Sequence, residues 1–293
     1  MKKIAVGLIA VLGLVVLQPA YAEEKKSIVI IDTAVDTTLP QLSGKIVHEV
    51  CLMEELRCPN GKSFMEGQGS ATLPATQAYS GGFAHGTIMS LIATNVNPDI
   101  NIVFIRIYPM DKRGNIASSA TNANSTVKQA LDWVVNNKSR FNIVGASVSL
   151  GHRPVRSGEN YCGVNRFDAG LRSSIVNLQN LGVASVFSTG NNYDKSRIDY
   201  PSCVSEAVAV SSVGPRGNTE RYANDAKQVD FYALGQYNTS LGTVSGTSAA
   251  TAAFTAYWAK NYKGNYQMTY DYIKSVAVTS DTSKVNSVVD VLK

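Results

Sequence analysis

Short apolar segments, separated by stretches with helical periodicity, constrain the fold of this chain more than any other feature. They cover 27–31, 101–107, 141–144, 183–187 and 207–211, and are rich in Val, Ile, Ala and Phe. Because they are apolar on both faces, these segments are typical of strands in a parallel sheet that is covered on both sides. Such a sheet requires helices between its strands.

The intervening segments supply those helices. Apolar residues recur at helical spacing over 127–135, which predicts a helix with one buried face. A weaker pattern covers 169–181 and ends before Gly182, a residue type common at helix C-termini. Residues 247–260 are small and apolar nearly all round, which predicts a buried helix. Together these patterns predict an α/β, three-layer fold with a mostly parallel central sheet flanked by helices, while most of 51–82 is expected to be irregular.

The N-terminal residues 1–22 have the pattern of a cleavable signal peptide. Lys2 and Lys3 precede the apolar run 4–17, and Ala-Tyr-Ala at 20–22 is a small-x-small cleavage site. Even as a helix, the apolar run would span only about 21 Å, against roughly 30 Å for the core of a bilayer. We therefore expect export to the periplasm or the extracellular space, with no membrane anchor.

The mature chain would run from 23 to 293, and it contains no repeat or convincing linker, so we expect a single domain. The formal net charge is +5, and loss of Lys2 and Lys3 with the signal peptide lowers it by two, to +3. So small a charge predicts neither nucleic acid nor a membrane surface as a partner.

The cysteines Cys51, Cys58, Cys162 and Cys203 all lie in the exported part. An even number in an exported chain predicts two disulfides, for which three pairings exist. The simplest is local pairing, Cys51 with Cys58 and Cys162 with Cys203. Metal ligation is the alternative, but the spacings lack a close C-x-x-C pair, so no metal site is predicted.

Three segments carry residues suited to catalysis. Asp32 follows the apolar segment 27–31, His85 begins a helix-like stretch, and Ser248 lies at the start of the buried helix 247–260. Catalytic groups in open α/β sheets gather at the carboxyl ends of strands and at the helix starts beside them. Alone, each residue also has a structural interpretation, as a solvated strand end, a structural hydrogen-bond donor or a helix N-cap.

Taken together, these segments resemble the subtilisin-like serine proteases, or subtilases. The order Asp, His, Ser along the chain is the one for which subtilisin is itself the reference example. The resemblance covers essentially all of 23–293. It also includes, in the order of the family, the segments Ser149-Leu150-Gly151, Thr189-Gly190-Asn191 and Asp199-Tyr200-Pro201.

The resemblance implies a role for each of these residues. Ser248 would be the nucleophile, His85 the general base, and Asp32 the group that orients the imidazole and stabilises it when protonated. The side-chain amide of Asn191 and the backbone N–H of Ser248 would form the oxyanion hole. The implied activity is that of a serine endopeptidase that acts on proteins or peptides through an acyl-enzyme, with no organic cofactor.

Substrate binding is implied at two places. Ser149, Leu150 and Gly151 would pair with extended substrate backbone as an added strand. Asp199 would form the floor of the primary specificity pocket and favour Arg or Lys at the cleaved residue. The alternative for Asp199 is a surface ion pair with Arg197 or Lys195.

The chain also departs from the family pattern, at Ala34, Ala84 and Ile88 beside the triad. Only residues 23–31 separate the predicted cleavage site from Asp32, which leaves no room for a pro-domain, so a separate chaperone or inhibitor protein is a candidate partner. No calcium loop is indicated before His85, and structural calcium elsewhere stays open.

Two other functions stay open. One is a non-catalytic peptide-binding module on the same fold, and the other is a peptide transferase or cyclase in which an amine intercepts the acyl-enzyme. A lipase or esterase is not indicated, because the chain has no Gly-x-Ser-x-Gly elbow.

Overall fold

The computed structural model describes residues 25–54, 57–117, 120–151, 162 and 169–278. The predicted signal peptide, 1–22, lies outside them. Within these ranges, none of the helices combines the length and the apolar character that crossing a membrane requires.

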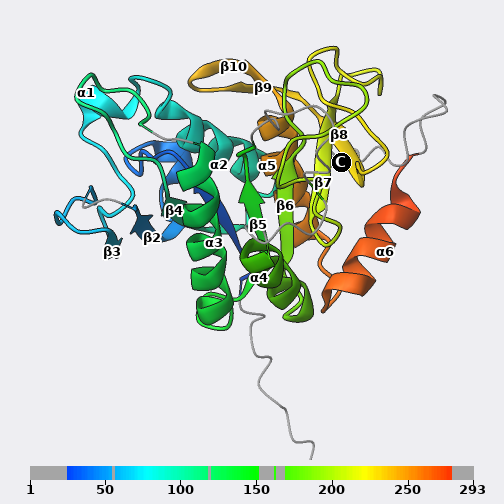
Figure 1. Ribbon diagram of the computed structural model, residues 1–293, viewed down its shortest axis with the longest axis horizontal. Helices are drawn as coiled ribbons and strands as arrows, with labels where there is room; N and C mark the ends of the chain where they lie inside the picture. The colour runs from blue at the N-terminus through cyan, green and yellow to red at the C-terminus, as the bar shows by residue number, and fades with distance from the viewer. Residues whose placement is uncertain (1–24, 55–56, 118–119, 152–161, 163–168, 279–293) are drawn as a thin grey trace, which may run out of the picture.

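An eight-stranded sheet forms the centre of the molecule, in the order β3-β2-β4-β1-β5-β6-β7-β8 (Figure 1). All neighbouring strands in it are parallel except β2 and β3. The strands are β1 Ser27–Asp32, β2 Ile46–Leu52, β3 Phe64–Glu66, β4 Asn101–Arg106, β5 Ile143–Val148, β6 Ala184–Ser188, β7 Val208–Val213 and β8 Phe231–Leu234, with β9 Gln236–Thr239 and β10 Gly242–Ser245 forming a separate hairpin.

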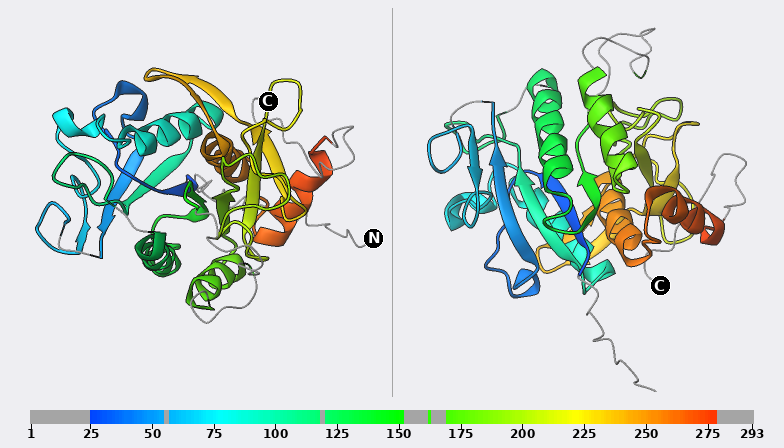
Figure 2. Two further views of the ribbon diagram at one scale, coloured as in Figure 1. Left: turned by 45° about the horizontal axis from the view of Figure 1, so that its top comes forward. Right: turned by 90° about the horizontal axis from the view of Figure 1, so that it is seen from below.

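Helices cover both faces of this sheet. Figure 2 shows α3 and α4 on one side and α5 on the other. The helical segments are η1 Pro40–Leu42, α1 Ala75–Ala78, α2 Ala84–Val96, α3 Ala120–Asn137, α4 Ala169–Asn180, α5 Thr247–Lys260 and α6 Tyr266–Val276. This arrangement confirms the predicted three-layer α/β fold with a mostly parallel sheet.

The alternation of side chains along β1 shows how the sheet joins two cores. Ile28 and Ile30 pack with α2 and α5 in one core, whereas Val29 and Ile31 pack with α3 and α4 in the other. The fully buried Trp258 of α5 also donates its indole N–H to the carbonyl oxygen of Val144 at 3.0 Å. A buried side chain of this size contributes about 1.5–3 kcal/mol or more, so α5 is firmly held against the sheet.

The start of one predicted strand needs correction. The strand predicted over 141–144 begins only at Ile143, because Asn142 adopts a left-handed conformation (φ 49°) in the turn between α3 and β5. Asparagine tolerates this conformation better than most residues. The prediction that most of 51–82 is irregular agrees with the structure, because the described residues of this range form regular elements only at the end of β2, in β3 and in α1.

Both disulfides have the predicted local pairing. Cys51, in β2, bonds to Cys58 in the following turn, and Cys162 bonds to Cys203. No free cysteine is left, so these four sulfurs are not available as metal ligands.

Candidate active site

Asp32 and His85 are joined at the carboxyl edge of the sheet. Asp32 is the last residue of β1 and is only 3% exposed, while His85 is the second residue of α2. The Nδ1 of His85 lies 2.8 Å from Oδ1 and 2.9 Å from Oδ2 of Asp32. Because a carboxylate only accepts, Nδ1 carries the proton, and Nε2 of the neutral ring is left as an acceptor.

Thr33 holds the start of α2 against β1, a role that the sequence analysis missed. Its hydroxyl donates to the carbonyl oxygen of Phe83 at 2.9 Å and accepts from the N–H of Gly86 at 3.0 Å. Its own N–H donates to Oδ1 of Asp32 at 2.7 Å. A Cβ on Gly86 would lie 2.5 Å from the carbonyl oxygen of Ala34, so glycine is required for this close approach.

The environment of His85 changes its basicity. Burial of the ring lowers the pKa of His85. The charge of Asp32 and its hydrogen bond to the ring together raise this pKa by more, so the net shift is upward from 6.5. The phenol of Tyr108 also has a raised pKa, through burial and then through the charge of Asp32. His85 therefore loses its proton at a higher pH than an unperturbed histidine does.

Asn191 and Ser248 are connected through Thr247. Ser248 is the second residue of α5 and is partly exposed. Oδ1 of Asn191 accepts from the N–H of Thr247 at 3.0 Å and from its hydroxyl at 3.1 Å, and that hydroxyl in turn accepts from the N–H of Gly190 at 3.2 Å. The Nδ2 of Asn191, near the start of α5, forms no hydrogen bond with the described residues.

The structure does not join all three predicted triad residues. His85 contacts the end of β1, and Thr247, next to Ser248, contacts Gly190 just after β6. His85 and Ser248 therefore lie at the same edge of the sheet, where α2 and α5 also pack against each other. No hydrogen bond links the two side chains, both of which lie in the described part of the chain. Catalytic hydrogen bonds are often long without substrate and tighten when it binds.

The three substrate-binding residues predicted after β5 lie beside the predicted pocket floor. Ser149 donates its hydroxyl to the carbonyl oxygen of Ser248 at 3.4 Å. A Cβ on Gly151 would lie 3.0 Å from Cβ of Asp199, and a Cβ on Gly190 would lie 2.2 Å from its Oδ2. Leu150 is buried. A side chain at either glycine would therefore crowd Asp199.

Asparagine amides hold the buried carboxylate of Asp199. Asn192 donates Nδ2 to both oxygens, at 3.2 and 3.0 Å, and Asn224 donates Nδ2 to Oδ1 at 3.0 Å. Arg197 is not its partner, because that guanidinium pairs with Asp194 at 3.0 Å. The sequence analysis missed both asparagines, because Asn192 next to Asn191 is ordinary turn chemistry and no local pattern marks Asn224.

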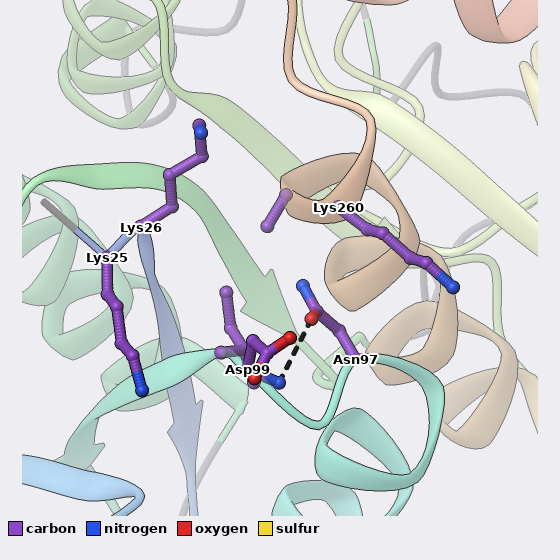
Figure 3. Close-up of a pocket in the computed structure, with 7 residues that line it drawn as sticks. Lys25, Lys26, Asn97, Asp99 and Lys260 are labelled. Atoms are coloured by element: carbon purple, nitrogen blue, oxygen red, sulfur yellow. Dashed lines mark hydrogen bonds between the residues drawn. The ribbon is translucent and has the colours of Figure 1, made fainter. Parts of the chain in front are cut away.

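A cavity of about 250 Å³ lies at the opposite edge of the sheet, where β1 begins (Figure 3). Lys25, Lys26 and Lys260 line it, but their side chains point away from one another in Figure 3. Asn97 and Asp99 form a local turn in which the N–H of Asp99 donates to Oδ1 of Asn97 at 3.3 Å. The described residues also include no group of three His, Cys, Asp or Glu side chains arranged to hold a metal ion.

Comparisons with known proteins identify the family to which the chain belongs. The model of the subtilase family matches residues 24–291. Among curated proteins, the chain is similar to the major intracellular serine protease of Bacillus subtilis (strain 168), with 25% identity over 228 residues. The match covers 71% of this chain but only 57% of that relative, so the chain spans little more than half of the relative's length.

Solved structures with the same fold include several proteases. A lanthipeptide protease matches with a TM-score of 0.68 and 15% identity, over 92% of this chain and 87% of that one. The nisin leader peptidase NisP from Lactococcus lactis matches with 0.66 and 17%, over 92% and 86%. A cold-adapted subtilisin-like serine proteinase matches with 0.61 and 20%, over 92% and 90%. The predicted fold and family are confirmed, and the chain belongs to the subtilase family of serine peptidases.

Proposed function

We propose that this chain is a serine endopeptidase with Asp32, His85 and Ser248 as its triad. The observation that carries the proposal is the contact of His85 Nδ1 with both oxygens of Asp32, at 2.8 and 2.9 Å. This contact fixes the tautomer whose Nε2 can accept a proton from a serine hydroxyl. The serine at the start of α5, on the same edge of the sheet, is Ser248.

The chemistry would proceed in two halves. Ser248 Oγ attacks the peptide carbonyl carbon and transfers its proton to His85 Nε2, while Asp32 stabilises the imidazolium. Asn191 Nδ2 and the N–H of Ser248 donate to the oxyanion. Collapse breaks the C–N bond, and the amine leaves with the proton from His85. A water molecule then attacks the acyl-enzyme by the same route and regenerates Ser248.

Specificity for Arg or Lys at the cleaved residue is part of this proposal. Side chains at Gly151 and Gly190 would crowd the carboxylate of Asp199, and a carboxylate at the base of a pocket favours a guanidinium or an ammonium group as its ligand. Segment 149–151 would pair with substrate backbone as an added strand. Two structural relatives are named for peptide processing, which supports a peptide or protein as substrate.

We further propose that 23–293 acts as a single domain after export to the periplasm or beyond the cell. The apolar run and cleavage pattern in 1–22 support this. Mass measurement of the protein recovered outside the cytoplasm tests it. A mature chain that begins at Glu23 is expected, and a protein that keeps Met1 would contradict export by cleavage.

The decisive experiment compares wild type with Ser248→Ala on unfolded casein. Wild type should cleave casein and react with a fluorophosphonate probe, and Ser248→Ala should do neither. Ser205→Ala, a matched change of an exposed serine, should behave as wild type. Cleavage of casein by Ser248→Ala would overturn the assignment of Ser248 as the nucleophile.

The missing hydrogen bond between His85 and Ser248 favours a non-catalytic peptide-binding module as the second candidate. Absence of both cleavage and labelling in the wild type would select it. Product masses separate hydrolysis from transfer or cyclisation, because only hydrolysis adds water to the acyl part.

A further inference from the structure

A second buried charge lies on the other side of Asp32 from Asp199. Strands β1 and β4 pair in parallel register, and Asp32 is the direct partner of Arg106. The sheet order places β4 on one side of β1 and β5 and β6 on the other. Arg106 is 3% exposed. At the carboxyl edge of the sheet, the buried carboxylate of Asp199 and the buried guanidinium of Arg106 therefore lie on opposite sides of Asp32.

The described residues satisfy the hydrogen-bonding groups of the Arg106 guanidinium only in part. Its Nε donates to the carbonyl oxygen of Tyr108 at 3.3 Å, and its Cζ lies 5.7 Å from the centroid of the Phe83 ring. Neither of its terminal nitrogens forms a hydrogen bond or ion pair with a described residue. Burial lowers the pKa of Arg106 to about 10, so it stays charged at neutral pH. A buried charge without a counter-ion is costly.

Arg106 also lines a cavity of about 490 Å³ that a ligand could enter. Arg57, Thr72 and Gln77 line the same cavity, and all three side chains can donate hydrogen bonds. Arg57 directs one nitrogen to the carbonyl oxygen of Met110 at 3.0 Å, which fixes it at the cavity wall. None of the described residues that line the cavity is Asp or Glu. Its lining is therefore cationic and rich in donors.

We propose that this cavity binds the carboxylate of an Asp or Glu side chain in the peptide substrate. The inference rests on the proposed function, because the substrate backbone must lie along 149–151. Successive side chains of an extended peptide point to opposite sides. If the cleaved residue points to Asp199, its neighbour points across Asp32 to β4 and Arg106. The acid would then be the second or fourth residue before the cleaved bond, counting the cleaved residue as the first.

The test uses matched peptides with Arg at the cleaved residue and Glu or Gln at the second, third or fourth position. For wild type, Glu at the second or fourth position should raise kcat/KM by about tenfold or more over Gln, since a charge-assisted hydrogen bond is lost with Gln. The third position should show no such preference. Equal rates for Glu and Gln at both even positions overturn the proposal without any variant.

Arg106→Met removes the charge of the guanidinium. The ratio of kcat/KM for the Glu peptide to that for the Gln peptide should then fall close to one. The control is Arg216→Met, which removes an equal charge from an exposed loop and should leave the ratio unchanged. Thermal unfolding checks that Arg106→Met folds, and Arg57→Gln is the second variant, with a smaller loss of the ratio expected. A ratio that survives in folded Arg106→Met overturns the assignment of Arg106.

Binding to Ser248→Ala separates failure of this inference from failure of the proposed function. Calorimetry with the Glu and Gln peptides should show tighter binding of Glu by about tenfold, whether or not hydrolysis occurs. Peptide cleavage by wild type with no Glu preference in binding would overturn the cavity proposal and leave the peptidase intact. A clear Glu preference in binding with no wild-type hydrolysis would overturn the peptidase and support the cavity.

Discussion

The two halves of the proposed triad differ in how far the structure engages them. On the side of β1 and α2, Asp32 and His85 are in direct contact at 2.8 and 2.9 Å. On the side of β6 and α5, hydrogen bonds fix the carbonyl oxygen of the Asn191 amide and leave its Nδ2 without a described partner. Ser248 likewise has no hydrogen bond to His85.

This difference matches the roles that the proposal gives to the two halves. The base and its carboxylate need a fixed tautomer before the reaction, so their contact is formed in advance. The nucleophile and the oxyanion donor must meet a substrate, so their reacting atoms have to stay free while the backbone around them is held. The following predictions test this division.

Asp32→Asn should produce the largest loss in the engaged half, about 10⁴-fold in kcat, because the amide favours the wrong tautomer of His85. The pH profile should also change. In wild type, the raised pKa of His85 places the acid limb above pH 6.5, and removal of the Asp32 charge leaves burial dominant, which moves that limb to lower pH.

Steady-state rates across pH 5 to pH 9 measure both effects, and Asp99→Asn, at an exposed site, serves as the control. The contribution of the Asp32–His85 pair to the stability of the fold also depends on pH. Because the folded-state pKa is raised, the pair stabilises the fold below about pH 6.5, and this contribution is lost as the pH rises through the folded-state value. If the acid limb of the pH–rate profile moves to higher pH in Asp32→Asn, the charge of Asp32 does not raise the pKa of His85, and the proposed role of the Asp32–His85 pair is wrong.

Asn191→Ala should lower kcat by about 10²–10³ with little change in KM. Subtilisin is the reference case for that magnitude, which we carry over to Asn191. Asn191→Asp keeps the acceptor for Thr247 but loses the donor, so it should be as damaging. Asn238→Ala, on the separate hairpin, is the control. An active Asn191→Asp would show that holding Thr247, and not donation to the oxyanion, is what matters.

Asp199→Asn should reduce the preference for Arg or Lys over Phe or Leu by about tenfold or more. The change removes the charge but keeps the shape of the pocket floor. Matched peptides that differ only at the cleaved residue measure the ratio, with Asp271→Asn in α6 as the control for net charge. Wild type that cleaves after Phe as fast as after Arg would remove the specificity proposal altogether.

Thr247→Val should have the smallest effect, about a tenfold loss in kcat. It removes the hydroxyl that links Gly190 to Asn191 but keeps the N–H that also donates to Asn191. A lost hydrogen bond of this kind costs about 1 kcal/mol, which a denaturation curve can detect. Thr247→Ser should restore activity. If it does not, the methyl group and not the hydroxyl positions the loop.

The sequence determined much of the fold because strand and helix signals are local. The segment 247–260 was predicted with the bounds observed for α5, and 27–31 matches β1 to within one residue. The chemical identities of Asp32, His85 and Ser248 could also be predicted, because each lies in a recognisable segment at the end of a strand or the start of a helix.

Only the tertiary structure decided how these segments support one another. No local pattern marks Thr33, Thr247 and Asn224, because they act through hydrogen bonds to residues distant in sequence. Asn192 bonds to Asp199 across a loop whose path the sequence does not show. The sequence also does not show that Arg106 is buried beside Asp32 without a described counter-ion. Pairing in a parallel sheet depends on the order of strands, and that order results from packing of the whole chain.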